Sequence, residues 1–200
     1  IFPLIKKIGL YKRYYGNVIG KSLSEIAPLA IKHQLIVSIN VGRKEIEDGQ
    51  FINILRRECL VNNLPLSLMK VELSEKAVSA ADILEGFCQE LKSLGVKISI
   101  DDFGVQNSNL ARLSQLEYDE IKIDKSLVDG ISEDYKQNIF VIFSDALAKL
   151  NKTLVFEGVE NETQYRFIAD RYPDALIQGW YFSKALTRGE LAKRLTGVAP

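Results

Sequence analysis

Two adjacent carboxylates, Asp101 and Asp102, follow directly after a short β-branched run, Val96–Ile100, and are themselves followed by Phe103-Gly104. A buried strand that ends in two acids indicates that the backbone leaves the core there. Neighbouring anions repel each other unless cations lie between them. A pair of divalent metal ions, bridged by one carboxylate, is a common solution. The alternative is that both aspartates cap the next turn and face water.

The other apolar runs end in polar side chains in the same way. In a (β/α)8 barrel the carboxyl ends of all strands converge on one face, which carries the active site. In an open sheet the same residues would lie in a row, too far apart to share an ion. The pattern therefore favours a barrel. The strand-end residues besides the aspartate pair are Asn40, Glu72, Lys122 with Asp124, Glu157 and Gln178.

The residue types indicate the chemistry. Carboxylate and amide oxygens without thiols or imidazoles suit Mg²⁺ or Mn²⁺ rather than zinc. Two such ions about 4 Å apart clamp a phosphoryl group and activate water, so phosphoester hydrolysis is the expected reaction. Lys122 would orient that water or neutralise charge on phosphate. Alternatively, Lys122 and Gln178 are structural, with the lysine paired to a neighbouring acid. Glu72 and Glu157 lie within apolar runs, where a buried carboxylate needs a partner.

Strand and helix patterns alternate along the chain, which predicts an α/β fold with a parallel sheet and crossover helices. The first helix is predicted to break near Gly16 or Gly20, and Gly95 to end the third. Asn161 with Gln164, and Thr187 with Glu190, are expected to cap the last two helices. We predict strands over 35–41, 68–73, 96–100, 120–124, 154–159 and 176–180, and helices over 3–33, 49–61, 78–94, 109–116, 134–150, from 161 to before Pro173, and from 187.

Apolar side chains at helical spacing predict which helix faces are buried. The expected inner positions are Leu23, Ile26, Ala27 and Ala30; Phe51, Ile52, Leu55 and Cys59; Ile83, Leu84, Phe87 and Leu91; and Ile139, Phe140, Phe143 and Leu147.

Composition fits one globular domain over residues 1–200, with 46% hydrophobic residues. The 26 basic and 26 acidic residues cancel, which argues against a broad basic face for a nucleic-acid polymer. No apolar run approaches the roughly 20 residues that cross a bilayer, and no signal peptide opens the chain. Cys59 and Cys88 are expected to be core thiols in a reducing cytoplasm. His33 is the single histidine, which argues against a Ser-His or Cys-His nucleophile pair.

Six motifs in order resemble those of EAL domains, bacterial phosphodiesterases that open cyclic di-GMP to linear pGpG with Mg²⁺ or Mn²⁺. The resemblance covers nearly the whole chain. The motifs are Asn40-Val41, Glu72-Leu73-Ser74-Glu75, Asp101-Asp102-Phe103-Gly104, Lys122-Ile123-Asp124-Lys125-Ser126, Glu157-Gly158-Val159-Glu160 and Gln178-Gly179-Trp180-Tyr181-Phe182-Ser183.

The resemblance implies a role for each matching residue. Lys122 would position the attacking water, with Glu157 and Asp102 also in the catalytic centre. Gln178 would line the mouth of the site. Asn40, Glu72 and Asp101 would hold one metal ion, and Asp101, Asp102 and Glu157 the other. Glu75 would fix the loop after the aspartate pair, and Asp124 and Glu160 would support the site.

Two departures from the family pattern bear on activity. The Glu-Ala-Leu strand of the family, which supplies a metal-binding glutamate, would lie upstream of Phe2-Pro3. Because a complete family barrel has eight strands and six are predicted here, we expect the domain to be incomplete at its N-terminal end. The alternative is a barrel that closes by some other means. Residues 105–109 read Val-Gln-Asn-Ser-Asn where active members usually have Thr-Gly-Tyr-Ser-Ser.

Two functions are therefore weighed. One is a working cyclic di-GMP phosphodiesterase. The other is a degenerate EAL domain that binds the dinucleotide, or a protein partner, without cutting it. The implied partners are cyclic di-GMP, a second copy of the chain, and an upstream sensory or regulatory domain. The expected location is the cytoplasm, including the cytoplasmic part of a membrane-anchored protein.

Overall fold

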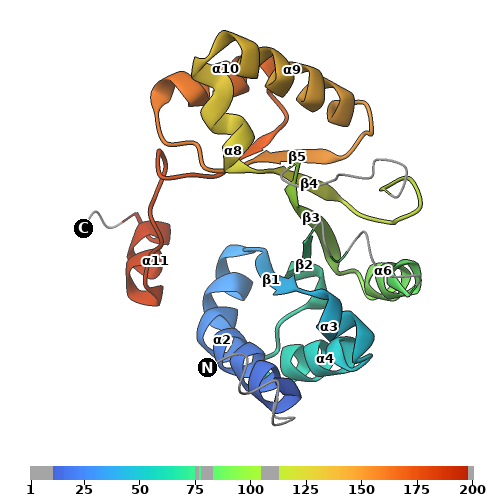
Figure 1. Cartoon of the computed structure of the whole chain (residues 1–200). Helices are drawn as coiled ribbons and strands as arrows, with labels where there is room; N and C mark the ends of the chain where they lie inside the picture. The colour runs from blue at the N-terminus through green and yellow to red at the C-terminus, as the bar shows by residue number, and fades with distance from the viewer. Residues whose placement is uncertain (1–10, 75–76, 78–82, 105–112, 198–200) are drawn as a thin grey trace.

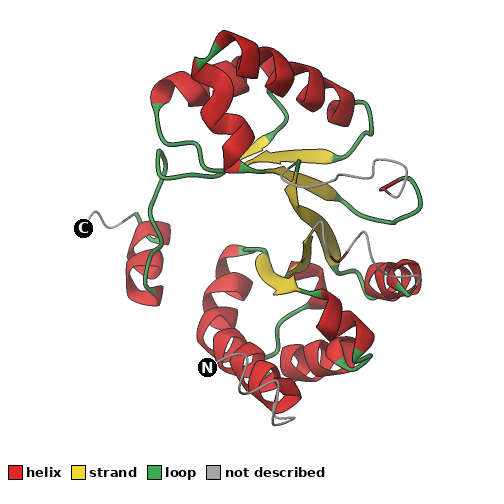
Figure 2. Cartoon of the chain, viewed as in Figure 1, coloured by secondary structure: helices red, strands yellow, loops and turns green. Residues whose placement is uncertain are grey.

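The described residues of this computed structural model, 11–74, 77, 83–104 and 113–197, form an alternating arrangement of strands and helices (Figures 1 and 2). Six strands pair in parallel and in chain order, as the sequence predicts. They are β1 (Val37–Val41), β2 (Met69–Ser74), β3 (Lys97–Phe103), β4 (Glu120–Ile123), β5 (Thr153–Phe156) and β6 (Leu176–Ile177). Within the described part of the chain, β1 and β6 are the outer strands of the sheet.

Helices alternate with the strands along the described chain. They are α2 (Tyr11–His33), α3 (Arg43–Glu47), α4 (Phe51–Val61), α6 (Leu84–Ser93), α8 (Lys125–Val128), α9 (Asp134–Ala148), α10 (Glu162–Arg171) and α11 (Arg188–Leu195), with 3-10 helices η1 (Leu66–Leu68) and η2 (Asp129–Ser132). Of these helices, α3, α8, η1 and η2 were not predicted. Figure 1 shows α9 and α10 beside β4 and β5, and α2 to α4 beside β1 and β2.

The two faces of the sheet differ sharply in polarity. Side chains of a strand alternate between faces. One set is apolar and fully buried in the core, for example Val71, Ile98 and Ile121. The alternating set forms what we call the inner face, and it is charged or polar: Lys70, Glu72, Ser99, Asp101, Glu120, Lys122 and, directly after β5, Glu157. The sheet thus carries a polar face above an apolar core.

The predicted break in the first helix is wrong: α2 runs unbroken through both glycines. The reason is packing, because α2 contacts α4. A Cβ on Gly16 would lie 3.9 Å from Ile54, and one on Gly20 only 2.8 Å from the Glu58 carboxylate. Both glycines thus face α4 from within the first helix and do not end it.

Most predicted inner positions are confirmed, but Ile83 and Ile139 are wrong. Their side chains are 50% and 42% exposed, whereas Leu84 and Phe140 beside them are fully buried. Ile83 is the N-cap of α6 and precedes the helix. Ile139 lies at the margin of its apolar stripe, where periodicity places a residue only approximately. Gly95, with a φ of 78°, follows the end of α6, which is the third predicted helix. The predicted caps at Asn161 and Thr187 are both present.

Strand limits also differ from the predictions at the site. β3 extends through Asp101 and Asp102, while β5 and β6 end earlier than predicted, at Phe156 and Ile177. Residues 109–112 of the predicted helix over 109–116 lie outside the described residues, and 113–116 are mostly turn and bend. No helix in the part of the chain that the structure describes is long and apolar enough to cross a membrane.

Candidate active site

Lys122 lies at the centre of the charged inner face. Its ammonium nitrogen Nζ is 3.0 Å from Glu72 Oε2 and 2.8 Å from Asp101 Oδ1. It is also 2.8 Å from Glu157 Oε1, and the lysine side chain is only 9% exposed. These acids come from β2, β3 and the end of β5, so residues far apart in sequence meet at one place.

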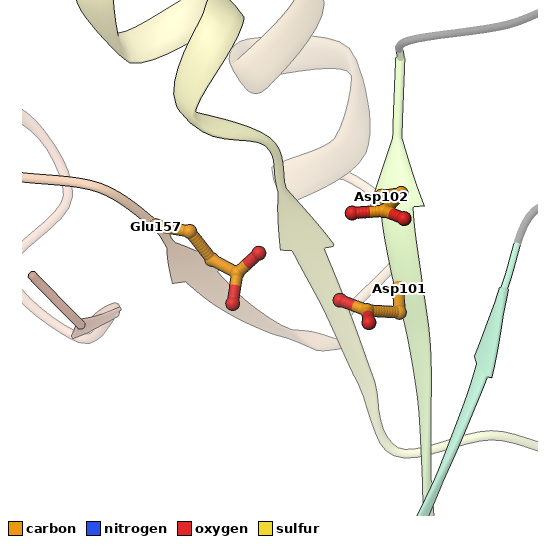
Figure 3. Close-up of side chains that lie close together, drawn as sticks. All are labelled: Asp101, Asp102 and Glu157. Carbon is orange, nitrogen blue, oxygen red and sulfur yellow. The ribbon is translucent and has the colours of Figure 1, made fainter. Parts of the chain in front are cut away.

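Asp101 and Asp102 present their carboxylates to the same side, although consecutive strand residues normally point to opposite faces. The pairing of β3 with β4 shifts register between Ile100 and Phe103, and Asp102 has a φ of 55°. Such an irregularity re-aims a side chain. Carboxylate oxygens of Asp101, Asp102 and Glu157 consequently lie within 4.8 Å of one another (Figure 3).

Packing against α9 holds this end of β3. The Phe103 ring stacks on Phe143 with centroids 5.8 Å apart. Gly104 has a φ of 102°, and a Cβ there would lie 2.7 Å from Leu127 and 3.1 Å from Phe143. Only glycine fits this turn, so the aspartates are fixed from behind by the core.

Glu157 and Gln178 follow the ends of β5 and β6 and are tied to the sheet through their backbones. The Glu157 N–H donates to Ile123 O at 3.0 Å, and the Gln178 N–H donates to Phe156 O at 2.8 Å. A Cβ on Gly179 would lie 2.0 Å from the Val159 carbonyl oxygen. The Gln178 side chain is exposed, and its place at the mouth of the site stays a prediction.

The remaining predicted residues have different surroundings. Asn40 is exposed at the end of β1, in register with Glu72, and no described residue bonds its side chain. Asp124 caps α8 by accepting from Ser126 N–H at 2.8 Å. Glu160 pairs with Lys125. Glu75 and the loop 105–109 lie outside the described residues, so their predicted contact stays a prediction.

The net effect of burial and neighbouring charges raises the pKa of both Lys122 and Glu157, but the balance of causes differs. Burial lowers the pKa of Lys122, but hydrogen bonds to Asp101 and Glu157 and attraction to Glu72 outweigh it, and the net pKa rises. Burial raises the pKa of Glu157, and repulsion from Asp101 and Glu72 adds to this, against the opposing effect of Lys122. The lysine is therefore held protonated, and the ionised form of Glu157 is disfavoured.

The donor set fits hard divalent cations. Four carboxylates, of Glu72, Asp101, Asp102 and Glu157, face a single ammonium group, which leaves excess negative charge. Carboxylate oxygens are the ligands of Mg²⁺ and Mn²⁺. These side chains could hold such an ion without any thiol or imidazole.

Sequence reasoning missed a groove beside Gln178. It has a volume of about 540 Å³ and is lined by Gln178, Trp180, Lys125 and Lys184, among others. The Lys125 and Lys184 ammonium groups lie 5.9 and 5.4 Å from the Trp180 ring centroid, and the tryptophan is 65% exposed. The signal was the Trp-Tyr-Phe run after Gly179, which lies next to a predicted strand end.

Several known proteins are similar to this chain. It is 30% identical to the cyclic di-GMP phosphodiesterase PdeA of Borreliella burgdorferi over 81% of the chain and 25% of that protein. It is 30% identical to the cyclic di-GMP phosphodiesterase NbdA of Pseudomonas aeruginosa over 84% of the chain and 22% of that protein. The chain spans about a quarter of the length of the curated relatives it matches.

Solved structures share the fold. The PaMucR phosphodiesterase in its c-di-GMP complex superposes with a TM-score of 0.84 at 25% identity, over 96% of this chain and 78% of that one. The EAL enzyme Bd1971 gives 0.85 at 21% identity over 100% of this chain and 55% of that one. The predicted TIM-like α/β fold is confirmed. The family model described as the EAL domain matches residues 1–185, and the chain belongs to the EAL domain family.

Proposed function

We propose that the protein hydrolyses cyclic di-GMP to linear pGpG, with Mg²⁺ or Mn²⁺, in bacterial second-messenger signalling. One observation carries the proposal: Lys122 joins Glu72, Asp101 and Glu157 at the strand ends, with Asp102 beside them. The similarity to PdeA and NbdA, which are named as cyclic di-GMP phosphodiesterases, supports this substrate.

Two ions would share the acids. Asn40, Glu72 and Asp101 would hold one, and Asp101, Asp102 and Glu157 the other, with Asp101 bridging. When bound, the ions would activate water and stabilise charge on the phosphoryl group and the leaving oxygen. The clustering of three carboxylates within 4.8 Å supports the second of these sites.

Lys122 would act as a hydrogen-bond donor rather than as a base. Its raised pKa keeps Nζ protonated at neutral pH. From its position between Asp101 and Glu157, the ammonium would orient the attacking water and neutralise charge that develops on the phosphate. Any proton removed from the water would go to a carboxylate, Glu157 or Asp102.

The groove beside Gln178 would take part of the dinucleotide. Trp180 offers an exposed ring for stacking a guanine base. Lys125 and Lys184, which flank that ring, would attract the anionic substrate. A homodimer and an upstream sensory or regulatory domain stay predictions about the intact protein.

A second candidate is a receptor that binds cyclic di-GMP without cutting it. The observation that favours it is the divergent sequence Val105–Asn109 directly after the aspartate pair. The four acids around Lys122 favour the enzyme, because a receptor has no need to keep the hydrolytic set.

The test is to incubate the intact protein with cyclic di-GMP and Mn²⁺ and to identify the product by chromatography. The enzyme gives pGpG, and Ca²⁺ inhibits, since the larger ion prefers looser coordination. Tight binding without pGpG at saturating Mn²⁺ would establish the receptor. Neither binding nor cleavage would indicate a protein-interaction role.

A further inference from the structure

A second ion pair lies on the inner face, below the acids that contact Lys122. Lys70 Nζ is 2.5 Å from Glu120 Oε2, with side chains 14% and 7% exposed. This pair joins β2 to β4, the two strands that also supply Glu72 and Lys122. A buried ion pair costs desolvation, so its presence under a charged site calls for an explanation.

The two ion pairs have their charges on opposite strands: β2 supplies the lysine of one pair and the glutamate of the other. Along β2 the order is Lys70 then Glu72, and along β4 it is Glu120 then Lys122. Each charge therefore has a partner on the other strand and an opposite charge two residues along its own strand. Strand geometry puts these same-strand neighbours about 6.6 Å apart at Cα, within reach of a lysine side chain.

The strand between them leaves room for the lower pair. In β3, Ser99 is in register with Glu72 on one side and Glu120 on the other. Its side chain is small and fully buried, and its hydroxyl oxygen has no hydrogen-bond partner within the described part of the chain. A larger side chain there would lie in the path from Lys70 to Glu120.

Loss of Glu120 would change where Lys70 goes. A buried ammonium without a counter-charge is strongly unfavourable. The carboxylate nearest along its own strand is Glu72, which already accepts from Lys122. Two ammonium groups on Glu72 would occupy the oxygens that a cation needs.

We propose that Lys70 and Glu120 are positioning residues that hold each other away from the site: the pair keeps Lys70 off Glu72 and so leaves Glu72 able to bind a divalent ion. Neither residue touches substrate. The inference rests on the proposed function, because it takes Glu72 as a metal ligand.

Mn²⁺ binding, measured on the intact protein by electron paramagnetic resonance, tests the pair without turnover. Glu120→Gln should weaken Mn²⁺ binding about 10-fold, since loss of a supporting contact behind a ligand has effects of this size. Lys70→Met combined with Glu120→Gln removes the freed ammonium and should return the affinity to within about 3-fold of the wild type. Glu133→Gln, in an exposed pair with Lys136, is the matched control.

A metal-free crystal structure of Glu120→Gln gives an independent readout. Lys70 should lie within ion-pair distance of Glu72, and thermal melting confirms that each variant folds. Wild-type Mn²⁺ affinity in Glu120→Gln, a double variant no better than the single one, or Lys70 still distant from Glu72 would each overturn the inference. A protein that binds Mn²⁺ but yields no pGpG refutes the phosphodiesterase and leaves this test intact. A wild type that binds no Mn²⁺ refutes both.

Discussion

Lys122 Nζ and Asp101 Oδ1, on adjacent strands, are 2.8 Å apart, and the same ammonium also contacts Glu72 and Glu157. The lysine thus neutralises part of a cluster that would otherwise repel itself. In the proposed function it would also neutralise charge that develops on a phosphate held by the metal ions. This double role makes it the most informative single position to change.

Lys122→Met should lower kcat by about 10²-fold or more with a smaller change in KM, because its contribution is made in the transition state. Steady-state hydrolysis of cyclic di-GMP measures both. Lys136→Met is the control, since Lys136 pairs with Glu133 on an exposed surface. Equal kcat for the two variants would show that Lys122 only neutralises its neighbours.

Glu157→Gln should stabilise the metal-free protein at neutral pH. The folded-state pKa of Glu157 is raised above its usual value, chiefly by burial. The folded protein therefore holds this proton more tightly than the unfolded chain, and stability falls as pH rises through the window from 4.5 upward. Glutamine removes that ionisation.

Thermal melting against pH, without metal, measures the effect. The variant should melt higher than the wild type at pH 7, and the difference should vanish below pH 4.5. A variant that is less stable at pH 7 would show that attraction to Lys122 outweighs burial.

Gly179→Ala should unfold the turn that carries Gln178. The new Cβ would lie 2.0 Å from the Val159 carbonyl oxygen and 2.4 Å from its nitrogen, both rigid backbone atoms. We expect a loss of about 2 kcal/mol in the free energy of unfolding. Gly86→Ala in α6, where a Cβ would meet nothing within 4 Å, should be neutral or slightly stabilising. Equal stability of the two variants would contradict this close approach.

Much of this architecture can be predicted from sequence because the carboxyl ends of parallel strands all lie at the same edge of the sheet. Runs such as 120–124 and 154–159 are apolar enough to identify strands, and their polar ends all fall on one edge. The residues at which the strands end were less predictable. The strand over 176–180 ends at Ile177, because Gly179 packs against Val159 in a contact between segments that no local pattern encodes.

The candidate active site also has features that the sequence predicts and features that depend on tertiary structure. The acids were identified as strand ends, but the register shift that turns Asp102 toward Asp101 depends on how β3 pairs with β4. The Lys70–Glu120 pair was missed for a related reason. Its members are 50 residues apart, and their meeting across β3 depends on the register of three strands.

Trp180→Ala should raise KM for cyclic di-GMP about 10-fold and leave kcat nearly unchanged, since stacking holds the base equally in ground and transition states. Tyr135→Ala, another exposed aromatic residue at 77% exposure on α9, is the control. Steady-state kinetics separates the two constants. An unchanged KM in Trp180→Ala would exclude the groove as part of the substrate site.

In the proposed function Asp101 would bridge two divalent ions, and counting bound Mn²⁺ in the intact protein tests this proposal most directly. Electron paramagnetic resonance should detect two Mn²⁺ per chain with exchange coupling between them. Asp101→Asn should lose that coupling and all pGpG formation, because the bridge would lose the charge that lets two cations lie so close. A single uncoupled Mn²⁺ in the wild type, or full coupling in Asp101→Asn, would contradict the account.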